Sequence, residues 1–176
     1  PNLEGLVELD KDAGNVLSTF GYGNIALDIR PSREVFNING DYNITKGSFH
    51  FVALGIAKKD FTLTEGSNIK FNGNIMDSDL NVKGIYTTKT SLSTLIVDTS
   101  SVSARKTVEC GIGISDKLKN PRLEFSIDVL DVDPTTKSRV ESALNTEDKI
   151  QKQFISLLVS NRFLPGDESG VVNTNN

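Results

Sequence analysis

The fold is decided by residues 35–44, VFNINGDYNI, in which every second position from Phe36 to Ile44 is apolar or glycine. The positions between them carry only Asn or Asp. Successive side chains of a β-strand point to opposite faces, so strict alternation produces one apolar face and one polar face. We therefore predict a β-strand here, with its apolar side turned toward a core or a groove.

The same alternation recurs from Gly23 to Val129, and turns rich in Gly, Asn, Asp and Ser separate the runs. The other clear runs are Ile25, Leu27, Ile29; Ile69, Phe71, Gly73; Val108, Cys110, Ile112, Ile114; and Leu123, Phe125, Ile127, Val129. This rhythm predicts an all-β fold, with weak strands between Leu3 and Leu17 and eight to ten strands between Phe20 and about Leu130. Turns are predicted at 30–32, 39–41, 46–48, 65–67, 72–74 and 120–121, and a loop or strand edge at 98–104. The pattern leaves open whether the sheet closes over its apolar face or exposes that face as a groove.

The pattern becomes helical after residue 132. Asp133 is suited to the N-cap and Pro134 to the first turn of a helix that ends near Leu144. A second helix is predicted from Glu147 to about Asn161, with its apolar side at Ile150, Phe154, Leu157 and Leu158. Its polar side is mixed rather than rich in Lys and Arg, which favours packing against the end of the sheet over lying on a membrane surface. We therefore divide the chain into a curled β-sheet segment at 1–132, two short helices that cap the sheet at 133–163, and a polar tail or linker at 164–176.

Composition excludes several classes of function. The formal net charge is −4 and no basic stripe is interleaved with aromatic residues, so we predict no nucleic-acid partner. Cys110 is the single cysteine, which excludes a disulfide framework and is typical of a small buried apolar residue. The apolar run 154–159 is too short to span a bilayer. Because the first residue is Pro1, we expect a segment excised from a longer protein.

Two patterns suggest catalysis or a cofactor, and both have simpler interpretations. Gly21, Gly23 and Ala26 match G-x-G-x-x-A, with Asp41 near the expected acidic position. That dinucleotide-binding pattern must open a helix, whereas here it runs into an alternating strand, so we interpret it as a turn at the strand's entry. His50 lies between two phenylalanines and no serine elbow G-x-S-x-G is present, which favours an exposed strand histidine.

Acidic pairs occur at residues 10 and 12, 77 and 79, and 131 and 133. None continues into an EF-hand loop, and we interpret them as solvated turns and a helix cap, with a surface cation as the alternative. The sequence thus predicts no catalytic residue, no metal site, no cofactor and no enzymatic activity.

Several blocks, in order, resemble the C-terminal region of TamB-like proteins, the translocation and assembly module family. Residues 40–51, GDYNITKGSFHF, are similar to that family's G-x-Y-x-I-x-x-G-x-Y/F-x-F block, and residues 65–75 and 79–88 are similar to the two blocks that follow it. Residues 110–114 and 118–125 resemble the later L-x-G-x-L-x-x-P-x-I-x-F block, and the helical residues 138–140 and 154–158 resemble the Bacteroidetes version. Phe71 and Ile75 stand where the family often has Trp and Pro, changes that keep strand character.

The resemblance implies a fold and a cellular setting. The expected fold is all-β with short C-terminal helices, an elongated and curled sheet that forms a groove with a hydrophobic inside, sometimes called a β-taco. The expected parent protein is anchored in the inner membrane of a Gram-negative bacterium and spans the periplasm. Its expected partners are phospholipid and an outer-membrane β-barrel protein of the TamA type, in outer-membrane biogenesis and phospholipid transport.

The function expected from this resemblance is a lipid conduit that shields acyl chains in the hydrophobic groove. The residues expected to line the groove are Ile25, Leu27, Ile29, Phe36, Ile38, Ile44, Phe49, Phe51, Phe61, Leu63, Ile69, Phe71, Leu80 and Val82. One alternative is a chaperone-like scaffold that receives outer-membrane strands by strand addition. Another is a closed structural or adhesin-like β-module whose apolar face is simply its core.

Overall fold

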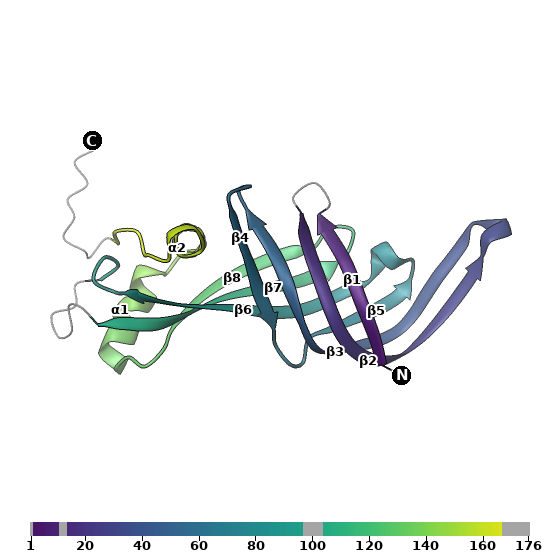
Figure 1. Ribbon diagram of the computed structural model, residues 1–176, viewed down its shortest axis with the longest axis horizontal. Helices are drawn as coiled ribbons and strands as arrows, with labels where there is room; N and C mark the ends of the chain where they lie inside the picture. Colours follow the sequence, from purple (N-terminus) through teal and green to yellow (C-terminus); the bar gives the residue numbers. More distant parts are fainter. Residues whose placement is uncertain (1, 11–13, 97–103, 167–176) are drawn as a thin grey trace. The chain divides into compact units, whose positions relative to one another are not determined.

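The computed structural model describes residues 2–10, 14–96 and 104–166 (Figure 1). The chain divides into two compact units. Unit 1 contains Pro1–Tyr86 and Ile112–Glu124, and unit 2 contains Thr87–Gly111 and Phe125–Asn176. Residues 98–103 of the predicted loop at 98–104 and most of the predicted tail at 164–176 lie outside the described residues.

Most of the described chain forms a curled, mostly antiparallel β-sheet that is followed by two helices, which confirms the predicted fold class. The strands are β1 (Asn2–Asp10), β2 (Asn15–Arg30), β3 (Val35–Ala53), β4 (Ala57–Leu63), β5 (Asn68–Gly73), β6 (Asp79–Ser91), β7 (Arg105–Lys117) and β8 (Arg122–Val129). The 3-10 turns are η1 (Pro31–Arg33) and η2 (Ile75–Asp77), and the helices are α1 (Pro134–Ala143) and α2 (Glu147–Ser160). The strand order is β1-β2-β3-β4-β6-β7-β8, and β5 pairs with both β3 and β6.

The predicted strand count was wrong, because strands are fewer and longer than the turn residues suggested. From Phe20 to Leu130 the described residues hold only β2 to β8, and β3 runs straight through the turns predicted at 39–41 and 46–48. Gly40 keeps its place in the strand with a φ of 128°, a conformation open to glycine. Near the second site the strand bulges: Phe20 pairs with Lys46 and Gly21 with Ile44, so Thr45 is an extra residue. The other four predicted turns do interrupt the strands or end them.

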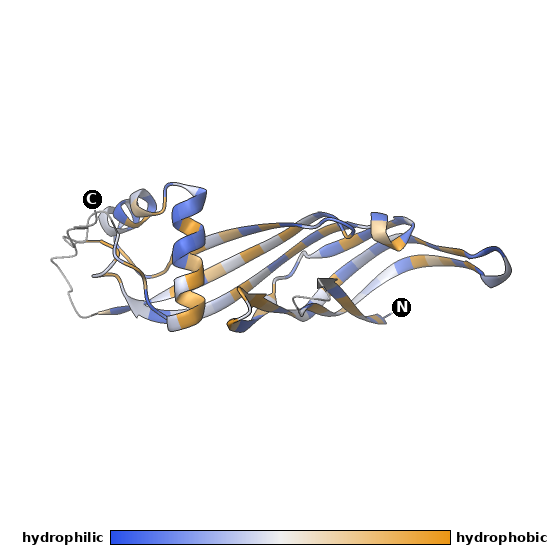
Figure 2. Ribbon diagram, turned by 90° about the horizontal axis from the view of Figure 1, so that it is seen from above, coloured by the Kyte–Doolittle hydropathy of each residue, from blue (hydrophilic) through white to orange (hydrophobic). Residues whose placement is uncertain are grey.

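Unit 1 buries the apolar positions of its alternating strands. Figure 2 shows hydrophobic and hydrophilic residues alternating along them. Leu17, Phe49 and Phe61 are fully buried, and the ring centroids of Phe51 and Phe61 lie 6.1 Å apart, edge to face. Aromatic pairs in this geometry contribute beyond the area they bury. The core of unit 1 is therefore built on one face of its sheet.

Unit 2 contains both helices: the first begins at its predicted cap, Asp133, and the second begins at the predicted Glu147 behind a cap, Thr146, that was not predicted. The Asp133 side chain accepts a hydrogen bond from the backbone N–H of Thr136 at 2.6 Å, and Thr146 does the same for Lys149 at 3.2 Å. Satisfying these otherwise unpaired N–H groups stabilises each first turn.

The apolar side of α2 packs on β8. Phe154, Leu157 and Leu158 are buried, and the ring of Phe154 lies 4.5 Å from that of Phe125 on β8. The Gln153 side chain also holds the backbone of Leu164 through two hydrogen bonds of 3.0 and 2.8 Å. These contacts place the apolar side of α2 against β8.

Candidate functional site

The strand register brings all the predicted groove residues onto one face of the sheet of unit 1, which we call the apolar face. Directly paired residues of antiparallel strands project from the same side. Five sets of partners lie on this side: Ile29 with Phe36; Leu27 with Ile38; Ile25 with Gly40 and Phe71; Tyr42 with Ile69 and Leu80; and Leu17 with Phe49 and Phe61. The four other predicted groove residues lie on the same side, because each is two residues along its strand from one of these partners. They are Ile44, Phe51, Leu63 and Val82.

The accessibility of these residues changes along the apolar face. The buried ones are Ile38, Ile44, Phe49, Phe51, Phe61, Leu63, Ile69, Leu80 and Val82. Ile25 and Phe71 are half-buried. Leu27, Ile29 and Phe36 are 60%, 53% and 49% exposed. The apolar face is thus a packed core over most of its length and an open apolar surface at one end.

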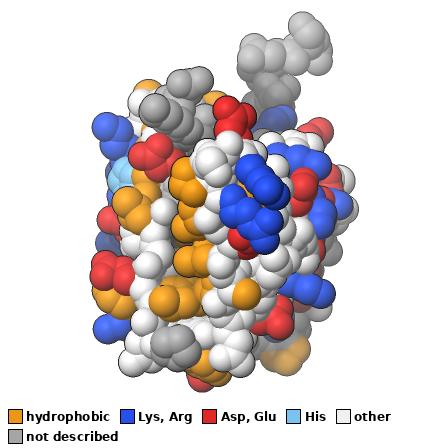
Figure 3. Space-filling view, turned by 90° about the vertical axis from the view of Figure 1, so that its right-hand side faces the viewer, with side chains coloured by type: hydrophobic (Ala, Val, Ile, Leu, Met, Phe, Trp, Pro, Cys, Tyr) orange, Lys and Arg blue, Asp and Glu red, His pale blue; other side chains and the backbone are white. Residues whose placement is uncertain are grey.

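The open end is the outer part of the β2–β3 hairpin. In the described residues, β1 pairs with β2 only as far as Tyr22, and β5 pairs with β3 only from Ile38 onward. Beyond these points β2 and β3 continue as a two-stranded ribbon to the turn at Pro31–Arg33. Figure 3, seen from the side at which this hairpin ends, shows hydrophobic side chains gathered in a stripe with Lys and Arg beside it. With few neighbouring strands, the ribbon leaves its apolar side uncovered.

Tyr42 lies in the buried part of the apolar face, and sequence reasoning left it out of the groove. It is 4% exposed. Its hydroxyl donates to the carbonyl oxygen of Leu3 on β1 at 3.0 Å and lies 3.0 Å from the Thr19 hydroxyl on β2. The side chain thereby ties β3 to both strands before it. The sequence pattern could have placed it there, because Tyr42 alternates in step with Ile38 and Ile44 and therefore faces the same side of β3.

The glycines of the rejected cofactor pattern lie inside β2, so its interpretation as a turn at the strand's entry was wrong. A Cβ added at Gly21 or Gly23 would lie 2.0 Å from the carbonyl oxygen of Asn43 or Asp41 on β3. Only a residue without a side chain allows this approach of the two backbones. A shallow hollow of about 480 Å³ lies beside this point, lined partly by Gly23, Ile25 and Gly40. The glycines therefore shape the sheet where its buried part gives way to the ribbon.

A family model described as the TamB C-terminal domain matches residues 3–176. The chain belongs to this family. TamB is a transport and assembly module of the Gram-negative envelope with a role in outer-membrane assembly, and it is not a known enzyme family. Searches of curated proteins and of solved structures return no match. No helix within the described ranges combines the length and apolar character needed to cross a membrane.

The first block of TamB resemblance, residues 40–51, falls entirely within β3. Its apolar and glycine positions lie on the apolar face on both sides of the bulge at Thr45. Phe71, in the second block, pairs with Gly40 of the first. Alternate residues of the first block and Phe71 of the second therefore form part of the apolar face.

The opposite face of the sheet is polar along the ribbon, whereas Leu6, Phe20 and Tyr22 are exposed on it where β1 pairs with β2. On the ribbon it carries the pairs Asn24 with Asp41 and Asp28 with Asn37. His50 also lies on this side, with a side chain that is 41% exposed and an Nδ1 atom 2.7 Å from Asp60 Oδ1. This matches the prediction of an exposed strand histidine, held here in a cross-strand pair with a carboxylate.

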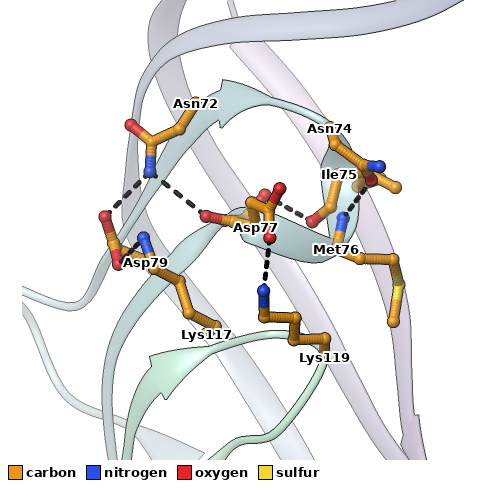
Figure 4. A network of polar contacts seen from close by, with 9 residues as sticks. Asn72, Asn74, Ile75, Met76, Asp77, Asp79, Lys117 and Lys119 are labelled. Atoms are coloured by element: carbon orange, nitrogen blue, oxygen red, sulfur yellow. Dashed lines mark hydrogen bonds and ion pairs between the residues drawn. The ribbon is translucent and has the colours of Figure 1, made fainter.

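The acidic pair near η2 is joined to lysines (Figure 4). Asp79 lies 2.7 Å from Lys117 and Asp77 lies 2.9 Å from Lys119, while Asn72 donates to Asp79 at 2.8 Å. The hydrogen bond from Lys117, followed by that from Asn72, holds the pKa of Asp79 below its ordinary value of 3.8. Across the described part of the chain, no three His, Cys, Asp or Glu side chains gather as a metal site. This network ties the β5–β6 connection to the end of β7.

Two further predictions concern single residues. Cys110 is fully buried, and burial raises the pKa of its thiol to about 12. The thiol is therefore protonated at neutral pH and unsuited to nucleophilic chemistry. Of the remaining acidic pairs, Asp133 forms the helix cap, whereas Asp12 lies outside the described residues.

Proposed function

We propose that this domain shields lipid acyl chains on its apolar face, within a TamB-like protein that carries phospholipid between the inner and outer membranes and supports outer-membrane biogenesis. The observation that carries the proposal is the uncovered end of that face, where Leu27, Ile29 and Phe36 are about half exposed or more. A contiguous apolar surface of this kind is unfavourable in water and commonly marks a binding site.

The accessible residues would contact the acyl chain first. Ile25 and Phe71 extend the exposed set toward the buried part of the face, and the polar side chains of the hairpin's other face remain in water. Each methylene removed from water contributes roughly 0.8 kcal/mol without any directional requirement. A bound chain can therefore be held firmly and still slide along the strands, while its head group stays at the polar rim.

The cellular setting of the proposal comes from family membership. We infer that the parent protein is anchored in the inner membrane, that this domain lies in the periplasm, and that a TamA-type outer-membrane barrel is its partner. In the same scheme, residues 1–132 form the lipid-shielding segment and 133–163 cap the sheet. Residues 164–176 serve as a polar tail or linker.

Mass spectrometry of an organic extract of the purified domain tests the proposal. Phospholipid should co-purify with the wild type and be reduced in Leu27→Glu and Phe71→Glu, because each places a charge on the lipid path. Leu6→Glu is the matched control: Leu6 is 72% exposed and pairs with Ser18, on the opposite face of the sheet. Lipid that persists in both groove variants, or that falls equally in the control, would contradict the assignment.

A second candidate, a chaperone-like scaffold, is favoured by the edge of β2. In the described residues no strand pairs with β2 between Gly23 and Arg30 on the side away from β3. That stretch contains no Pro or Lys, the residues that commonly protect an edge from strand addition. A peptide copied from an outer-membrane strand should slow amide hydrogen exchange at Ala26 and Asp28 if the edge accepts it. Unchanged exchange there at saturating peptide would remove this candidate.

The third alternative, a closed β-module, is the least supported. The strand order of the described residues has two ends, β1 and β8, instead of forming a ring. A closed core would also leave no reason for the exposed apolar end of the β2–β3 ribbon.

A further inference from the structure

The turn between β3 and β4 in unit 1 is apolar and almost fully exposed. Leu54 is 77% exposed and Ile56 is 70% exposed, and both lie between the paired residues Ala53 and Ala57. Hairpin turns are usually built from Asn, Asp, Gly or Ser, which remain hydrated at little cost. Two large apolar side chains at such a position are costly in water.

The backbone conformation of this turn is also unfavourable for Leu54. Leu54 has a φ of 54° and Gly55 a φ of 70°, and the turn closes with the N–H of Ile56 donating to the carbonyl oxygen of Ala53 at 3.1 Å. Two central residues with positive φ suit Asn-Gly, whereas a bulky residue there is an outlier. Leu54 therefore serves neither the turn nor the core, which points to a role in binding.

The charge around the tip indicates what it binds. Residues 51–59, FVALGIAKK, contain two lysines and no acidic residue, and the next residue, Asp60, lies 2.7 Å from His50, in a chain whose net charge is −4. Lys58 is exposed, and the Lys59 ammonium lies 5.4 Å from the centre of the Tyr86 ring. Apolar side chains at an exposed tip with the exposed Lys58 just behind them match an anionic membrane surface, where the tip enters the head-group boundary and the Lys58 ammonium meets lipid phosphates.

We propose that the tip formed by Leu54, Gly55 and Ile56 docks this domain onto an anionic lipid bilayer. This inference does not depend on the lipid-shielding proposal, because docking uses the tip and shielding uses the apolar face. The two meet along β3: Phe49, Phe51 and Ala53 of the apolar face lead directly to the turn. Docking at the tip would therefore present one end of that face to the membrane.

Co-sedimentation of the 176-residue chain with vesicles tests the proposal. The chain should bind vesicles of equal parts phosphatidylglycerol and phosphatidylcholine more tightly than vesicles of phosphatidylcholine alone. The double variant Leu54→Asn, Ile56→Thr should bind the anionic vesicles at least about tenfold more weakly than the wild type. Lys58→Glu should weaken binding to the anionic vesicles by about fivefold or more and leave binding to neutral ones nearly unchanged.

Two controls separate docking from folding. Because Asn tolerates a positive φ better than Leu, Leu54→Asn should leave the melting temperature unchanged or raise it, so lost binding cannot be attributed to unfolding. Leu6→Ser removes an equally exposed leucine from the sheet and should leave vesicle binding unchanged.

A fluorescent reporter checks insertion directly. The chain has no tryptophan, so Ile56→Trp introduces a single reporter whose emission should shift to shorter wavelength on anionic vesicles. Absence of wild-type binding to anionic vesicles, equal binding by the double variant, or an unshifted emission would overturn the inference. Because phospholipid co-purification is measured separately, failure of docking leaves the shielding proposal standing, and the reverse also holds.

Discussion

Replacing Tyr42 with Phe should loosen the attachment of β1 to unit 1. The change removes only a hydroxyl, which lies 3.0 Å from both the Leu3 carbonyl oxygen and the Thr19 hydroxyl. The residue is 4% exposed, so water cannot fully replace either contact. Each such hydrogen bond contributes about 0.5–1.5 kcal/mol, which gives a loss of roughly 1–2 kcal/mol in the free energy of unfolding. For a chain of this size, each kcal/mol lowers the melting temperature by about 2–4 °C.

Urea unfolding followed by circular dichroism measures this loss, and amide hydrogen exchange locates it. Exchange should quicken in β1 more than in β4, because the lost contact joins β3 to β1 and β2. Tyr22→Phe is the control, since Tyr22 is 53% exposed and pairs with Asn2 and Asn43 on the opposite face. The reasoning fails if the two variants lose equal stability, or if Tyr42→Phe leaves exchange in β1 unchanged.

Three other substitutions test the sheet, a helix cap and the polar network. Gly23→Ala should lower the free energy of unfolding by roughly 1–3 kcal/mol, because its Cβ would meet the Asp41 carbonyl oxygen at 2.0 Å. In urea unfolding, Gly113→Ala should cost clearly less, since its Cβ would meet nothing nearer than 4.0 Å. Asp133→Ala should cost about 1 kcal/mol, seen as faster amide exchange in the first turn of α1, and an unchanged rate would show that the cap contributes nothing. The pKa of Asp79 is lowered by folding, so its contribution is present above the ordinary carboxyl pKa of 3.8 and is lost as the pH falls through the folded value. Asp79→Asn should therefore be less stable than the wild type at neutral pH and equal to it well below pH 3.8, and a difference that persists in acid would contradict this.

Alternation was enough to predict which side chains share a face, because period two follows from strand geometry alone. It could not predict their accessibility: Leu27 and Ile38 are direct partners, yet they are 60% and 9% exposed. The difference arises because β5 pairs with β3 beside Ile38 and no described strand lies beyond Leu27. Burial therefore depends on which strands end where, information that a single run of residues does not contain.

Two errors in the sequence-based reading have local causes. The residues around Gly40 and Gly47 have turn propensity, but pairing with β2 on one side and with β4 or β5 on the other keeps β3 extended. Tyr42 was left out of the groove although it alternates in step with Ile38 and Ile44. Only the structure shows that the hydroxyl reaches two strands while the ring stays on the apolar face.

Because Thr45 is an extra residue in β3, the positions that face the apolar side change from even-numbered to odd-numbered there. Before it the inward positions are even-numbered, as in Ile38 and Ile44, and after it they are odd-numbered, as in Phe49 and Phe51. Strand geometry without a bulge would turn one half over, because a one-residue slip moves every side chain to the other face. Deleting Thr45 would make Ile44 and Lys46 neighbours, as their partners Gly21 and Phe20 are on β2, so a regular strand would still turn Ile44 and Phe49 to the same side. The bulge therefore absorbs an inserted residue and keeps both halves of the longest strand turned toward the same side.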